Sequence, residues 1–165
     1  MRGATYFSKF WILAIVLLTV GCDQVSKELT RTEVKPSAYI PIIGEHFILT
    51  NVENTGAMLG FGQNFPPIVK RLFLQGLSFL VLLVLLYRIL SKPNLNFLML
   101  IAFALVVGGG MGNLIDRIAH GSVTDFFLIK FGFLRTGIFN IADVAVTTGV
   151  LILIFLIVKR KEIAF

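Results

Sequence analysis

Residues 108 to 143 read GGGMGNLIDRIAHGSVTDFFLIKFGFLRTGIFNIAD and connect two long apolar runs. Polar side chains gather where those runs end: Asn113, Asp116, Arg117, Asp125, Asn140 and Asp143. An ionisable group near the centre of a membrane helix costs about 2.5–3.5 kcal/mol, and less toward the interface, so such groups usually mark function. The stretch therefore predicts an active site at a membrane surface, with Asp125 and Asp143 as its working pair.

The composition of the chain predicts one membrane-embedded domain covering residues 1–165. A hydrophobic content of 56% is too high for an ordinary soluble domain of this length. The net charge of +6 comes from Lys and Arg at the ends of apolar runs, where such residues orient membrane helices, and does not indicate nucleic acid binding. A single cysteine, Cys22, excludes an internal disulfide and a multi-cysteine metal site.

Four apolar runs are long enough to cross a bilayer, which takes about 20 residues of helix. We predict spans at about 8–25, 68–90, 95–115 and 138–158. Pro93 and Asn94 break the short link between the second and third spans, which should therefore be antiparallel neighbours. The expected fold is a membrane all-α core in the form of a four-transmembrane-helix bundle.

The charges predict how this bundle is oriented. Four spans put both termini on one side, and the Lys and Arg of that side cluster in short segments and tails. Eight of the nine acidic residues fall on the other side. Because basic residues in short segments orient membrane proteins, we expect both termini in the cytoplasm and the polar span ends at the outer face.

The two outer connections differ in character. In the first, about 29–67, residues 46–53 are rich in β-branched and aromatic side chains and predict a strand, with a turn at 54–57. We expect a small extracytoplasmic sheet there, lying on the membrane and extended by residues 38–43. The second connection, 117–137, mixes Phe with Arg and Lys, which suits a segment half-sunk among the lipid headgroups.

Helical spacing predicts a polar clasp beside the two working aspartates. Asp23 and Lys27 stand at i and i+4, and Asn113, Asp116 and Arg117 share one helix face. We expect Asp23 to pair with Lys27, and Asp116 with Arg117, so that each pair holds helix ends together.

The working pair, Asp125 and Asp143, has no cation at helical spacing to either carboxyl once those pairs are formed. Two carboxylates brought together share one proton, because both cannot ionise cheaply. The ionised one can then take a proton from water while the protonated one hydrogen-bonds the scissile carbonyl.

Other classes of protein also fit parts of the chain. A small transporter or channel would place Asp and Asn at span ends, although it should carry polar residues through the bilayer. A non-enzymatic lipoprotein would be anchored at Cys22, because residues 18–22, LTVGC, have the form of a lipobox; otherwise Cys22 is a small apolar residue of a retained helix. The run 108–112 lacks the Gly-Lys-Ser/Thr of a phosphate loop and favours a close helix–helix contact.

Five sequence blocks, in order and covering nearly the whole chain, resemble the lipoprotein signal peptidases (signal peptidase II). They are Asp23-x3-Lys27, Asn54-Thr-Gly56-Ala57, the run from Gly108 to Arg117, Gly121-x-Val123-x-Asp125-Phe126, and Phe139-Asn140-x-Ala142-Asp143. The resemblance implies that Asp125 and Asp143 are catalytic. The positions that surround them in the family fall on Asp23, Lys27, Asn54, Gly56, Asn113, Asp116, Arg117, Asn140 and Ala142.

The resemblance also implies a reaction and a location. The protein would be an intramembrane aspartic endopeptidase that cuts a prolipoprotein just before its diacylglyceryl-modified cysteine, without metal or cofactor. It would act as a monomer in the bacterial cytoplasmic (inner) membrane, in contact with membrane lipid. The chain departs from the family at three places. Gly110 stands where the family usually has Ala, and Met58 and Leu59 stand where it has Ala and then an aromatic residue. Thr136 and Gly137 stand where the family usually has a Pro shortly before the Phe-Asn pair. We expect the last two departures to bear on substrate fit and loop rigidity.

Overall fold

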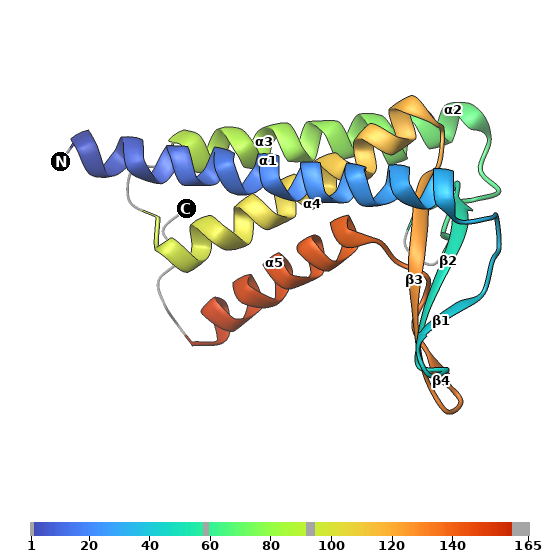
Figure 1. Cartoon of the computed structure of the whole chain (residues 1–165). Coiled ribbons are helices and arrows are strands. Elements are labelled where there is room, and N and C mark those ends of the chain that lie inside the picture. The colour runs from blue at the N-terminus through green and yellow to red at the C-terminus, as the bar shows by residue number, and fades with distance from the viewer. Residues whose placement is uncertain (1, 58–59, 92–94, 160–165) are drawn as a thin grey trace.

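The computed structural model describes residues 2–57, 60–91 and 95–159, and arranges them as a helix bundle with a sheet across one end (Figure 1). Within these residues, four helical stretches are long and apolar enough to cross a membrane: Phe10–Glu33, Pro67–Ser91, Phe97–Ala119 and Ile141–Val158. The four predicted spans are thus confirmed as helices. Pro93, Asn94, Met58 and Leu59 lie outside the described residues.

The helices differ from the predicted spans mainly at their ends. Helix α1 (Arg2–Glu33) continues two turns beyond the predicted end at residue 25. The second span is one helix built from α2 (Pro67–Lys70), a π-helical segment η2 (Arg71–Leu77) and α3 (Ser78–Ser91). Helix α4 (Phe97–Ala119) is longer than predicted, and α5 (Ile141–Val158) begins three residues later, because Asn140 caps it.

Helix α4 forms the centre of the bundle. It contacts α1, α3 and α5, and the apolar core gathers around it from Ile12, Val16, Leu100, Phe103, Val107 and Leu156. A Cβ added at Gly108 would lie 2.8 Å from Thr19 Cβ of α1, and one at Gly112 would collide with the Asp23 carboxylate. The predicted close helix contact at 108 and 112 is therefore confirmed, and small residues let α1 and α4 approach.

The sheet draws its strands from both outer connections. Strands β1 (Ile40–Ile43) and β2 (Phe47–Asn54) come from the first, whereas β3 (Val123–Phe131) and β4 (Leu134–Arg135) come from the second. The four strands are antiparallel in the order β1-β2-β3-β4. The predicted small sheet is confirmed, with two strands in the first connection, but its placement in that connection alone is wrong. Strand β3 of the second connection pairs with β2, about 70 residues away.

The sheet runs across the ends of α1 and α4 and extends past the start of α5 (Figure 1). The first turns of α1 and the last turns of α5 lie at the opposite end of the bundle (Figure 1). This arrangement puts the polar ends of the helices against the sheet. It agrees with the expectation that the start of the first span and the end of the fourth lie on one side, while the compartment on each side stays a prediction.

Candidate active site

The two predicted working aspartates line the same cavity, although they come from different elements. Asp125 belongs to β3, and Asp143 lies in the first turn of α5. The cavity has a volume of about 590 Å³ and is also lined by Asn54, Asn113 and Arg117. The fold therefore gathers five residues that are spread over 90 positions of the chain.

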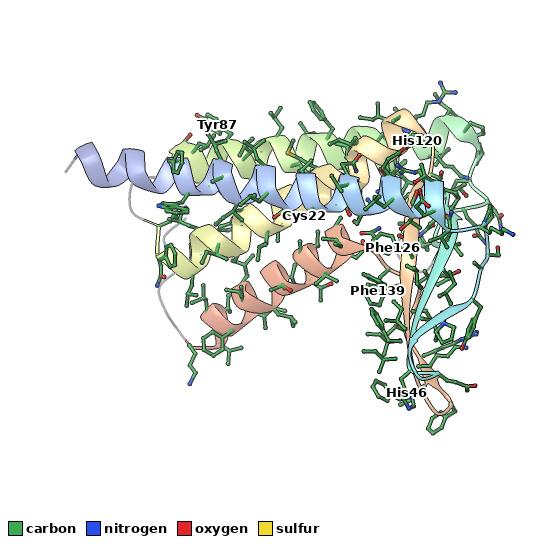
Figure 2. The ribbon with its side chains drawn as sticks, viewed as in Figure 1. Cys22, His46, Tyr87, His120, Phe126 and Phe139 are labelled. Atoms are coloured by element: carbon green, nitrogen blue, oxygen red, sulfur yellow. The ribbon has the colours of Figure 1, made fainter. Side chains whose placement is uncertain are left out.

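A short antiparallel bridge brings Asp143 to Asp125. Phe127 N donates to Phe139 O at 2.8 Å, and Phe139 N donates back to Phe127 O at 2.9 Å. Phe126 and Phe139 lie at the junction between the sheet and the start of α5 (Figure 2). Because this bridge ties the segment before α5 to β3, the first turn of α5 begins beside Asp125.

Three asparagine amides donate to the two carboxylates. Asn54 Nδ2 donates to Asp125 Oδ2 at 3.0 Å, and Asn140 Nδ2 donates to Asp125 Oδ1 at 2.6 Å. Asn113 Nδ2 donates to Asp143 Oδ1 at 2.8 Å. Each aspartate is thus held by amide groups from other elements.

Backbone and lysine donors set the orientation of these amides. Asn54 Oδ1 accepts from Gly56 N, and Asn140 Oδ1 accepts from Asp143 N, each at 2.9 Å. Asn113 Oδ1 accepts from Lys27 Nζ at 2.9 Å. Since every amide oxygen faces a donor, every NH₂ group must face its carboxylate.

Glycine is required at position 56, where an added Cβ would lie 2.7 Å from the Gly60 carbonyl oxygen. The turn at residues 54–57 can therefore close tightly enough for Gly56 N to reach the Asn54 side chain.

Asp143 also takes part in capping α5. Asn140 and Asp143 form a capping box, in which Asp143 Oδ2 accepts from Asn140 N at 3.2 Å. The N-terminus of a helix favours negative charge. Asp143 is thus a carboxylate with both oxygens hydrogen-bonded and one flank open to the cavity.

The environment of Asp125 favours protonation. The side chain is only 4% exposed, and burial raises the pKa of Asp125 to about 6, with a further contribution from the negative charge of Asp143. Hydrogen bonds from Asn54 and Asn140 oppose this rise in the pKa. Asp125 can consequently hold a proton much closer to neutral pH than an ordinary aspartate.

The predicted pair of Asp23 and Lys27 is confirmed. Lys27 Nζ lies 2.7 Å from Asp23 Oδ2 and 3.2 Å from Asp116 Oδ2, and all three side chains are fully buried. With its bond to Asn113, the ammonium uses all three of its hydrogens. Asp23 also links α1 to α5, because its Oδ1 accepts from Ala142 N at 2.9 Å.

The predicted pair of Asp116 and Arg117 is wrong. Neighbouring residues on a helix point in different directions. Asp116 faces α1 and forms ion pairs with Lys27 and with Arg31, whose NH2 lies 3.0 Å from Asp116 Oδ1. Arg117 turns toward the cavity, where NH2 donates to Gly56 O at 3.1 Å and NH1 donates to Asn113 O at 3.4 Å.

Several polar residues of the site escaped the sequence prediction. Gln24 Nε2 donates to Asp116 Oδ1 at 3.0 Å, and Arg31 Nε donates to Thr124 Oγ1 at 2.8 Å. The spacing 23, 27, 31 places Arg31 on the same helix face as Asp23 and Lys27. The apolar pattern that predicts the first span stops at about residue 25, before Arg31.

The loop before α5 is held by hydrogen bonds at the position of one departure from the family pattern. Thr136 N donates to Ile129 O at 3.0 Å, and Thr136 Oγ1 accepts from Ile129 N at 3.1 Å. A proline at 136 could not make the first of these bonds. Thr136 and Gly137 both line the cavity, so the departure lies where a substrate would fit.

Comparison with known proteins gives consistent matches over most of the chain. The family model described as signal peptidase (SPase) II matches residues 15–159. A lipoprotein signal peptidase of Moorella thermoacetica is 37% identical over 141 residues, covering 86% of this chain and 88% of the relative. One of Pelodictyon phaeoclathratiforme is 41% identical over 145 residues, covering 82% and 83%. A solved bacterial membrane enzyme superposes with a TM-score of 0.81 at 29% identity, covering 93% of each chain.

Proposed function

We propose that this chain, which belongs to the signal peptidase (SPase) II family, is an aspartic endopeptidase that cuts diacylglyceryl-modified prolipoproteins on the N-terminal side of the lipidated cysteine. Membership in this family makes the chain a protease of a bacterial membrane. The aspartic mechanism rests on one observation, which is that Asp125 and Asp143 line a single cavity and are each held by asparagine amides.

The surroundings of the two carboxylates support different roles for them. Asp143 accepts hydrogen bonds on both oxygens from Asn113 and Asn140 and has one flank open to the cavity, which suits the base that faces water. Asp125 is buried and holds a proton more readily, which suits the acid.

In the reaction, Asp143 takes a proton from water as the water oxygen bonds to the scissile carbonyl carbon, and Asp125 gives its proton to the carbonyl oxygen. When the carbon–nitrogen bond breaks, the proton on Asp143 passes to the leaving nitrogen. Asp125 recovers its proton from the hydroxyl that becomes the new carboxyl group.

The rest of the cavity suits an amphiphilic substrate. Apolar side chains from the sheet, the loop and α5 line it beyond the aspartates, among them Ile129, Ile138, Val144 and Val146. Thr147, one turn deeper on α5, belongs to the same wall. A signal peptide and the lipid on its cysteine both reside in a bilayer, so an apolar wall leading into the membrane-spanning part of α5 would receive them.

Helix α1 packs as a structural part of the bundle, which argues against a lipoprotein anchored at Cys22. Cys22 is exposed near the middle of α1 (Figure 2). Ile12 and Val16, which precede it, are almost fully buried in the core. Removal of residues 1–21 would open that core, so we propose that α1 is retained. We also propose that the enzyme is a monomer and that its site lies at the outer face of the membrane.

Cleavage of purified substrate tests this function. The enzyme should convert a diacylated prolipoprotein into a product whose mass begins at the lipidated cysteine, and it should leave the unlipidated precursor intact. Equal cleavage of both precursors would contradict the proposed substrate class. Cleavage at another bond would contradict the proposed cut site.

A further inference from the structure

Arg31, in the last turn of α1, contacts two fully buried groups that stand next to the site residues. Its Nε donates to Thr124 Oγ1 at 2.8 Å, and its NH2 lies 3.0 Å from Asp116 Oδ1. Thr124 immediately precedes Asp125 on β3. Asp116 lies one turn from Asn113, the residue that holds Asp143.

The backbone N and the side-chain hydroxyl of Thr124 both form hydrogen bonds with charged side chains. Its backbone N donates to Asp116 Oδ2 at 3.2 Å, and its hydroxyl donates to Glu53 Oε1 at 2.7 Å while accepting from Arg31. Successive strand residues point to opposite faces of a sheet. Because Asp125 points into the cavity, the Thr124 side chain points away from it and cannot touch a substrate.

We propose that Arg31 and Thr124 are positioning residues that set where the Asp125 carboxyl stands relative to Asp143. Asp143 is tied to the last turns of α4 through Asn113. Asp125 is tied to α4 and α1 through its neighbour Thr124, which bonds to Asp116 and to Arg31. This role rests on the proposed function, since it presupposes that the two aspartates work together. A displacement of about 1 Å can cost on the order of 10²-fold in rate.

The exposed contact of Arg31 provides an internal comparison. Glu28 lies 3.5 Å from Arg31 NH1 and is 66% exposed, whereas Asp116 and Thr124 are fully buried. Exposed ion pairs contribute little because solvent screens them. The buried contacts of Arg31 are therefore the ones that hold β3 against the ends of α1 and α4.

Isosteric substitutions at Thr124 test this role. Thr124→Val keeps the shape and loses the hydroxyl, Thr124→Ser keeps the hydroxyl, and Thr32→Val makes the same change at an exposed position of α1. With diacylated substrate, Thr124→Val should lower kcat on the order of 10- to 10²-fold with KM nearly unchanged. Thr124→Ser should recover most of the loss, and Thr32→Val should behave as wild type.

The pH profile separates positioning from a loss of stability. If Thr124→Val lets Asp125 drift from Asn54 and Asn140, the pKa of Asp125 rises further, because those bonds hold it down. The profile should then shift toward higher pH when measured well below the melting transition. Unchanged kcat and profile in Thr124→Val would overturn the proposal, as would a lowered kcat without this shift or without rescue by serine.

Arg31→Lys covers the case in which Thr124→Val does not fold. Lysine keeps a cation for Asp116 but lacks the planar fork that reaches two acceptors at once. The kcat of Arg31→Lys should fall, with the same shift of the pH profile. Glu28→Gln should have the kcat and pH profile of the wild type. If the two variants had the same kcat and pH profile, the proposal would also be overturned. A failure of the proposed function itself would give a different result. Either the wild-type enzyme would not cleave the diacylated substrate, or the Asp125→Asn variant would still cleave it.

Discussion

Lys27 of α1 donates to Asn113 of α4 at 2.9 Å, and the same asparagine donates to Asp143 at 2.8 Å. A buried ammonium thus stands one residue away from a proposed catalytic carboxylate. The same ammonium forms ion pairs with Asp23 and Asp116. Stability and geometry of the site therefore depend on one side chain.

Lys27→Ala should destabilise the protein strongly. Removal of the ammonium takes away the cation that pairs with buried Asp23 and leaves Asp116 with Arg31. Breaking a buried pair typically costs about 3–5 kcal/mol. Thermal unfolding in detergent, measured together with turnover, checks this expectation. A variant that melts like wild type but does not turn over would place Lys27 in the catalytic machinery.

Asp125→Asn and Asp143→Asn should each abolish most of the activity. Asparagine keeps the shape but cannot ionise, and lost acid–base function costs on the order of 10²–10⁴-fold. The double variant should lose little more, because residues that act as a unit are not additive. Single-turnover cleavage of a diacylated substrate measures this, with Glu45→Gln as a control outside the site. Near-normal cleavage by either single variant would rule out the two-aspartate mechanism.

Stability should fall as pH rises through the titration of Asp125. Its pKa is raised from 3.8 to about 6, so the folded protein binds this proton more tightly than the unfolded chain does. The contribution is fully favourable below about pH 4 and is lost as pH rises to about 6 and above, a change on the order of 3 kcal/mol. The melting temperatures of wild type and Asp125→Asn are measured at pH 4.5 and at pH 7.5. Between these two pH values, the melting temperature of the variant should rise relative to that of the wild type. Parallel shifts in both proteins would show that Asp125 is not the titrating group.

Thiol labelling in intact cells should report the proposed orientation. After Cys22→Ala removes the background, Lys35→Cys should react with a membrane-impermeant reagent, whereas Ser91→Cys should be shielded. Both positions are exposed, and they lie just beyond α1 and at the end of α3. Labelling of the cysteine at 91 but not at 35 would place the aspartates on the cytoplasmic side.

The sequence by itself determined that four spans are helical and that Asp23 pairs with Lys27. These two follow from local rules, because the length of an apolar run decides whether a helix can cross a bilayer, and residues four apart on a helix are neighbours. The sequence also predicted Asp125 and Asp143 as a working pair, and both line one cavity. The glycines at 108 and 112 likewise indicated a close helix contact, since a missing side chain removes the steric barrier to approach.

Only the tertiary structure decided the partners of Asp116 and the origin of the sheet. Asp116 turns from its neighbour Arg117 to Lys27, Arg31 and Thr124, and β3 pairs with β2 across about 70 residues of chain. Strand alternation shows which side chains share a face, but it does not show which strand lies alongside. The amides of Asn54, Asn113 and Asn140 reach the two carboxylates only when four elements have closed around one cavity, because each amide lies far along the chain from the carboxylate that it binds.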